Sequence, residues 1–234
     1  MSEHIVQAFD AELNAITEQI SELGALAEKQ FADSIQALCH ADTTLAEAVR
    51  ARDPQLDELA ARIEGDAIGL TARRQPLAVD LRHVMAAIRI ASNLERVGDL
   101  AGNIAKRALA VAPDLLPKAF SDPVQRMGEL AQLQLHGAME AYLARDAERA
   151  RWVWEHDARI DVLHTMLFRD IVGAMVEDAA PMFDLAHLLF VIKNIERVGD
   201  HATNIAENVE YLVRGQQPTQ PRPKKDDSST LREV

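Results

Sequence analysis

The sequence has few aromatic residues and few glycines, and this argues against a β-rich fold. Aromatic residues make up 4% of the 234 positions and glycine occupies 10, whereas Ala, Leu, Glu and Arg are abundant. The abundant residues are good helix formers. Hydrophobic residues still account for 48% of the chain, which is enough to bury a core. We therefore expect an all-α protein.

Cysteine, long apolar runs and positive charge are also scarce. The single cysteine, Cys39, cannot form an internal disulfide and is typical of a reducing compartment. No run of about 18 apolar residues occurs, and no basic segment precedes an apolar one at the N-terminus, so we expect a cytoplasmic protein without a membrane span or signal peptide. The formal charge of −12 disfavours nucleic-acid binding, which needs a basic face.

Three long helices are predicted in the first half of the chain. Apolar residues recur at intervals of three and four over residues 4–39, which indicates one helix. Asp42 is a capping residue for a second helix, which Pro54 should kink or start afresh after Asp53, and which Pro76 should end. A third helix is predicted over residues 80–108, with Asp80 as its cap.

The second half repeats this order. At an offset of 104 positions, Asp146 corresponds to Asp42 and Asp184 to Asp80; farther along, the offset falls to 101. Ala158 stands where the first half has Pro54, so the middle helix should be continuous in the second half. A period of about 100 residues indicates a domain duplication.

We therefore predict two tandem three-helix bundles related by pseudo-twofold symmetry. The first repeat is expected over residues 1–112 and the second over 113–214. Residues 215–234 are rich in proline and polar side chains and are expected to form a disordered tail.

One motif occurs twice and carries an unusual pattern of charge. Asn93–Asp99 reads Asn-Leu-Glu-Arg-Val-Gly-Asp, and Asn194–Asp200 differs from it at one position. In both copies Glu and Asp are four residues apart, so on a helix their carboxylates share one face about 5–6 Å apart. Like charges at this spacing cost roughly 0.2–0.5 kcal/mol. A bound cation would offset this cost.

The repeat comparison adds a second acidic pair to each half, and the four pairs predict metal sites. If neighbouring helices bring the pairs together, the oxygen-rich clusters would suit Mg, Mn, Ca or non-haem Fe, and Zn is a further candidate. Gly98 and Gly199, between the acids, would leave room for ions. The predicted ligands are Asp53, Asp57, Glu95, Asp99, Asp157, Asp161, Glu196 and Asp200, with Asn103 and Asn204 as additional candidates.

Other interpretations of the acidic pairs remain open. Such pairs are often only solvated surface, and salt bridges between helices are the main competitor for a metal. Arg96 and Arg197 follow each Glu, but adjacent helical residues point about 100° apart, so we expect these arginines to face elsewhere. We find no Glu-x-x-His pair, phosphate loop or nucleophile motif, and therefore expect no catalytic residues and no enzyme.

The doubled Glu-Arg-Val-Gly-Asp motif, followed by Asn-Ile-Ala at 103–105 and 204–206, resembles the PhoU family of phosphate-transport regulators. The resemblance covers residues 4–213. It implies two three-helix bundles, multinuclear metal clusters and a homodimer or higher oligomer. It also implies partners: the ATPase subunit of the phosphate-specific ABC transporter and a sensor histidine kinase, through which the protein would be held at the inner face of the membrane.

The resemblance further implies negative regulation of phosphate uptake and of phosphate-starvation signalling when phosphate is plentiful. Two alternatives remain. One is a carboxylate-bridged metal-dependent phosphohydrolase, and the other is a metal-buffering helical protein.

Overall fold

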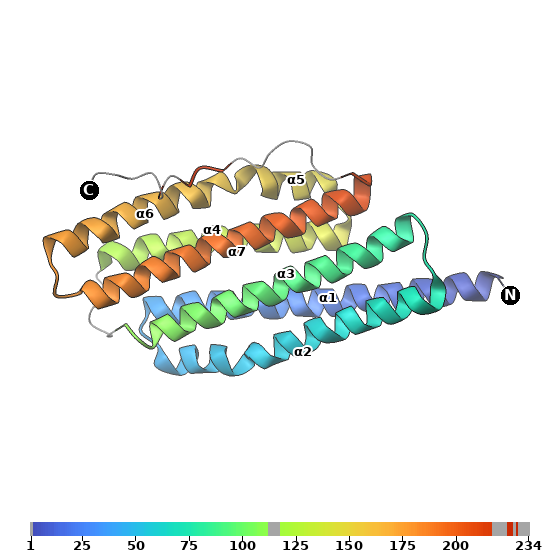
Figure 1. The fold of residues 1–234 in the computed structure, drawn as a ribbon, viewed down its shortest axis with the longest axis horizontal. Helices are drawn as coiled ribbons and strands as arrows, with labels where there is room; N and C mark the ends of the chain where they lie inside the picture. The colour runs from blue at the N-terminus through green and yellow to red at the C-terminus, as the bar shows by residue number, and fades with distance from the viewer. Residues whose placement is uncertain (1, 112–117, 217–223, 227, 229–234) are drawn as a thin grey trace.

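The structure, a computed structural model, describes residues 2–111, 118–216, 224–226 and 228, and its long elements are all helices. Figure 1 shows them side by side along one long axis. Over the described residues they are α1 (Ser2–Cys39), α2 (Thr43–Arg74), α3 (Val79–Ala108), α4 (Lys118–Ala144), α5 (Ala147–His156), α6 (Ala158–Glu177) and α7 (Met182–Arg214). The all-α prediction is confirmed.

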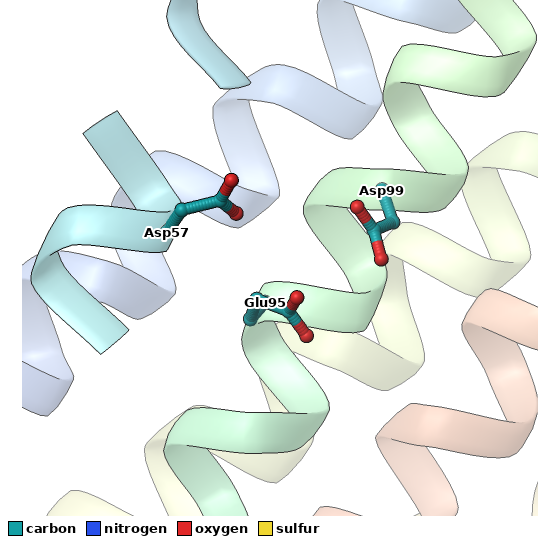
Figure 2. A group of neighbouring side chains, drawn as sticks. All are labelled: Asp57, Glu95 and Asp99. Atoms are coloured by element: carbon teal, nitrogen blue, oxygen red, sulfur yellow. The ribbon is translucent and has the colours of Figure 1, made fainter. Parts of the chain in front are cut away.

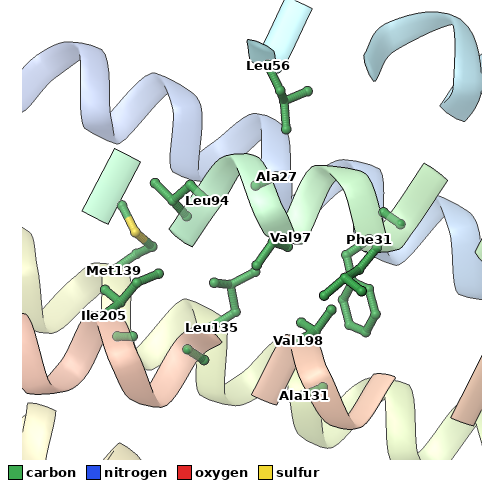
Figure 3. Packing of buried hydrophobic residues seen from close by; sticks show 14 of the residues in the cluster. Ala27, Phe31, Leu56, Leu94, Val97, Ala131, Leu135, Met139, Val198 and Ile205 are labelled. Carbon is green, nitrogen blue, oxygen red and sulfur yellow. The ribbon is translucent and has the colours of Figure 1, made fainter. Parts of the chain in front are cut away.

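Two three-helix bundles share one core. Helices α1, α2 and α3 pack on one another, and α4 and α7 pack with the α5–α6 pair. The bundles join where α3 lies against α7 and α1 against α4. Figure 3 shows this junction, where side chains from both halves meet. The labelled core residues are Ala27, Phe31, Leu56, Leu94, Val97, Ala131, Leu135, Met139, Val198 and Ile205.

The expectation of a continuous middle helix in the second half was wrong. Helix α2 runs through Pro54 without interruption, whereas its counterpart is divided at Asp157 into α5 and α6. Asp157 keeps helical angles (φ −58°, ψ −39°), but its carbonyl accepts from the Ile160 N–H at 2.9 Å, three residues on. This tighter bonding ends the regular ladder locally.

The helix starts are partly as predicted. The Asp42 side chain caps α2 by accepting from the Leu45 N–H at 2.9 Å, and Asp146 caps α5 in the same way. Asp80 and Asp184, in contrast, are not caps: the cap positions of α3 and α7 are Ala78 and Pro181, without side-chain hydrogen bonds. Both carboxylates lie in the first turn, where the helix dipole favours negative charge.

Most of the predicted disordered tail, residues 217–223, 227 and 229–234, lies outside the described residues. Gly215, with φ 74°, caps the C-terminus of α7. Residues 224–226 and 228 are described and lie beside α6 (Figure 1). In the part of the chain described here, no helix is both long and apolar enough to span a membrane.

Candidate metal centre

Three predicted ligands converge in the first half of the molecule. Asp57 extends from α2, and Glu95 and Asp99 extend from successive turns of α3 toward it (Figure 2). One carboxylate oxygen from each lies within 4.8 Å of the others. The helical spacing of the motif therefore places Glu95 and Asp99 on one face, as expected, and the packing of α2 against α3 adds Asp57.

Asp53, one turn before Asp57, completes what we call the first acidic cluster: Asp53, Asp57, Glu95 and Asp99. Burial raises the pKa of Asp53, and the nearby charges of Asp57 and Asp99 raise it further. Burial and then Asp99 likewise raise the pKa of Glu95. The carboxylates thus disfavour one another's ionised forms.

A buried glutamine that the sequence analysis did not select supports this cluster. Gln30, on α1, is 1% exposed and donates from Nε2 to Asp53 Oδ1 at 3.1 Å. Its Oε1 is buried without a hydrogen-bond partner. Gln134 on α4 lies 104 positions later, is 3% exposed, and has the same orphaned oxygen. The repeat offset that paired the acids would also have identified these glutamines.

Arg96 lies closer to the cluster than predicted. Its guanidinium contacts Asp99 Oδ2 at 2.7 Å and Glu95 Oε2 at 3.2 Å. The expectation that it faces elsewhere was wrong because helical spacing fixes only the direction of Cβ, and a long arginine side chain can fold back over its own turn. Arg96 is therefore a solvent-exposed counter-ion of Glu95 and Asp99.

The motif glycines serve helix packing. A Cβ added to Gly98 would lie 2.7 Å from Leu56 Cδ2, and one added to Gly199 would lie 2.7 Å from Ile160 Cδ1. Leu56 and Ile160 are both core residues at 1% exposure. The facing helix thus takes up space beside each glycine, and at Gly199 the added Cβ would also lie 3.4 Å from Asp157 Oδ1 and from Gln134 Oε1.

The corresponding residues of the second half, Asp157, Asp161, Glu196 and Asp200, form what we call the second acidic cluster. They are more deeply buried: Asp157 and Asp161 are each 2% exposed and Glu196 is 4% exposed. Burial raises the pKa of Glu196, and the charge of Asp200 adds to the effect.

Protein groups already contact all four of these carboxylates. Thr203 Oγ1 donates to Asp157 at 3.2 Å, and Lys193 Nζ lies 2.9 Å from Glu196. The C-terminal segment supplies the rest: the Lys225 N–H donates to Asp161 at 2.8 Å, and Lys224 Nζ lies 3.6 Å from Asp200. Among the described residues, only Asp57, Glu95 and Asp99 form a group within metal-bridging distance.

The two candidate asparagines lie beside the motif without joining the carboxylates in any recorded contact. Asn103 is exposed on α3. Asn204 donates from Nδ2 to Asn93 Oδ1 at 3.3 Å, and His201 Nδ1 lies 2.9 Å from the same oxygen. These contacts connect α7 to α3 across the junction of the bundles, so Asn93 and Asn204 hold the halves together.

The donor set of the first acidic cluster fits a hard cation. Three convergent carboxylates, a fourth beside them and a buried amide oxygen without a partner provide only oxygen ligands, which Mg²⁺, Mn²⁺, Ca²⁺ and non-haem iron accept. Such an ion would offset the burial and the carboxylate repulsion that raise the pKa of Asp53 and Glu95, and it would link α2 to α3.

Comparisons with known proteins agree with this architecture. The PhoU domain matches residues 20–108 and 124–209, one copy in each half. The chain is 47% identical over 231 residues to the phosphate-specific transport system accessory protein PhoU homolog of Rhizobium meliloti (strain 1021), covering 99% of this chain and 98% of that protein. The homologue of the same name from Caulobacter vibrioides is 43% identical over 226 residues, covering 97% and 98%.

Solved structures show the same arrangement of helices. The crystal structure of PhoU from Pseudomonas aeruginosa superposes with a TM-score of 0.86 at 34% identity, covering 89% of this chain and all of that one. The phosphate transport system regulatory protein PhoU from Streptococcus pneumoniae gives a TM-score of 0.84 at 27% identity, covering 91% and 100%. On its two matched domains, its similarity to these relatives and its shared fold, this chain belongs to the PhoU family.

Proposed function

We propose that this protein is an accessory regulator of phosphate-specific transport. The observation that carries the proposal is the near full-length similarity to the Rhizobium meliloti accessory protein, at 47% identity. In the finer form of the proposal, the protein links the transporter's ATPase subunit to a sensor histidine kinase. It restrains uptake and starvation signalling when phosphate is plentiful, and it acts as a homodimer or higher oligomer without catalysis of its own.

We propose that the first acidic cluster is the metal site of this regulator. Asp57, Glu95 and Asp99 would hold the ion, with Asp53 and Gln30 beside them. A bound divalent or trivalent ion would supply positive charge between α2 and α3. The chain's own contribution is to hold the carboxylates together against their repulsion and to place this surface where a phosphate ion or acidic partner residues can reach it.

A pull-down tests the regulatory role. The purified chain would be mixed with the transporter ATPase and the sensor kinase at high and low phosphate. Capture of both partners, stronger at high phosphate, is the expected result, and capture of neither at any phosphate concentration would overturn the role. Light scattering on the same sample gives the oligomeric state.

A phosphatase and nucleotidase screen with Mn²⁺ or Mg²⁺ separates the regulator from a metal-dependent phosphohydrolase, because a regulator should show no turnover. Binding of many ions per chain together with failure to capture the ATPase would instead indicate a metal buffer.

A further inference from the structure

The two acidic clusters differ in what lies next to them. In the first half, a pocket of about 360 Å³ opens beside Asp57 and Glu95, and Ala60 and Ser92 are among its lining residues. Ala60 corresponds to His164 at the repeat offset of 104, and Ser92 corresponds to Lys193 at the offset of 101. The second half therefore has an imidazole and an ammonium group where the first half has small side chains.

His164 and Lys193 hold the C-terminal segment in this place. Asp226 lies with Oδ1 3.3 Å from His164 Nδ1 and Oδ2 3.4 Å from Lys193 Nζ. The Ser228 N–H also donates to Asp226 Oδ1 at 3.0 Å. Burial alone would raise the pKa of Asp226, but the hydrogen bonds from Ser228 and the neighbouring His164 and Lys193 hold it below its usual range. Asp226 is thus a stable anion.

Lys224 and Lys225, which precede Asp226, contact carboxylates of the second acidic cluster. The Lys225 N–H donates to Asp161 Oδ2 at 2.8 Å, while the Lys225 side chain is exposed. Lys224 places its ammonium 3.6 Å from Asp200 Oδ1. Lys193 contacts Glu196, so the cationic and N–H groups together contact Asp161, Glu196 and Asp200 of the second acidic cluster. The equivalent residues of the first cluster are Asp57, Glu95 and Asp99, whose carboxylates converge on one another.

We propose that the segment Lys224–Asp226 is an intramolecular occupant of the second acidic cluster, and that a divalent cation binds there only when this segment leaves. The segment complements the site: the Lys224 ammonium and the Lys225 backbone N–H meet the acids, and Asp226 meets His164 and Lys193. The competition with metal extends the cation binding proposed for the first acidic cluster to the equivalent carboxylates of the second; the docking of the segment does not depend on it.

Competition of this kind raises the apparent Kd for metal at the second cluster by the inverse of the fraction of time that the segment is undocked. A segment docked nine-tenths of the time raises the apparent Kd about tenfold. The first half, with Ala60 and Ser92, has no matching contacts for such a segment. The two clusters should therefore fill at different metal concentrations, with the first cluster filling first.

Lys225 offers a matched pair of variants for the full-length chain. Lys225→Pro removes the backbone donor to Asp161, whereas Lys225→Ala keeps this donor and loses only an exposed charge. A third variant, Asp226→Ala, breaks the contacts with His164 and Lys193. Hydrogen–deuterium exchange without metal measures docking, and Mn²⁺ titration by calorimetry measures competition.

We expect the residue 225 amide to exchange slowly in the wild type and in Lys225→Ala, and rapidly in Asp226→Ala. In the titration, Lys225→Pro and Asp226→Ala should bind the weaker Mn²⁺ equivalent about tenfold more tightly than Lys225→Ala does. An unprotected amide in the metal-free wild type would overturn the docking. If the residue 225 amide of the wild type is protected but Lys225→Pro and Lys225→Ala bind Mn²⁺ with equal affinity, the proposed competition would be overturned. Complete absence of Mn²⁺ binding with a protected amide would overturn the metal site and leave the docking intact.

Discussion

Gln30 on α1 donates its amide to the carboxylate of Asp53 on α2, so a third helix helps to position the first acidic cluster. The contact is 3.1 Å long and part-buried, and the other atom of the amide, Oε1, faces no protein partner. A hydrogen bond of this kind contributes roughly 0.5–1.5 kcal/mol. It orients an acid that would otherwise turn toward water.

Gln30→Met should weaken Mn²⁺ binding at the first acidic cluster by about three- to tenfold, the equivalent of one hydrogen bond. Stability should change little, because the variant also removes the buried orphaned oxygen. Gln134→Met is the matched control in the second half and should leave this affinity unchanged. Calorimetric titration of both variants checks the prediction, and equal effects of the two changes would contradict it.

Acidification should destabilise the fold through His83. Burial lowers the pKa of this histidine to about 4, and the nearby charge of Arg145 contributes. The Arg145 guanidinium, which can only donate, lies 3.2 Å from His83 Nδ1, so the ring must be neutral to accept. The unfolded chain binds a proton near pH 6.5, and stability is therefore lost as the pH falls from about 6.5 to 4.

The loss should reach up to about 3 kcal/mol, the value of a shift of this size. His83→Gln, which can still accept from Arg145 but does not titrate, should flatten this part of the pH profile. His40→Gln, at an exposed position, should leave the profile unchanged. Urea denaturation between pH 4 and 7 measures the stability of both variants. If His83→Gln loses stability with falling pH as the wild type does, His83 would be excluded as the source of this pH dependence.

The glycines of α2 and α3 should respond differently to alanine. At Gly65 an added Cβ meets nothing within 4 Å, so Gly65→Ala should stabilise the protein by about 1 kcal/mol through helix propensity. At Gly98 the same atom would lie 2.7 Å from Leu56 Cδ2, in the core. Gly98→Ala should therefore lack this gain or reverse it. Urea denaturation compares the two, and an equal gain would show that α2 and α3 are not closely packed here.

Local periodicity and the internal repeat were enough to predict most of the helical scaffold. Asp42 caps α2 because its preference is local, and Glu95 and Asp99 share a face because helical geometry requires it. The division of the second-half helix was not predicted: it occurs at Asp157, where no proline stands, while α2 runs through Pro54 as one helix. Tertiary contacts override weak local preferences.

The groups that contact the carboxylates of the second acidic cluster could not be predicted from helical spacing. Lys225 contacts Asp161 through its backbone, a donor that every non-proline residue carries and that no sequence pattern marks. A signal was nevertheless present where the two repeats differ, because His164 and Lys193 replace Ala60 and Ser92. Positions at which a duplicated sequence diverges beside a shared motif are therefore as informative as the motif.

Cation binding by the first acidic cluster is tested most directly by measuring Mn²⁺ binding to the variant Glu95→Gln/Asp99→Asn. The control is Asp10→Asn/Glu47→Gln, which removes the same charge from exposed positions away from the cluster. Calorimetry and elemental analysis should show that the control keeps the tighter Mn²⁺ equivalent and that the cluster variant loses it. Equal metal content in the two proteins would contradict the assignment of the site.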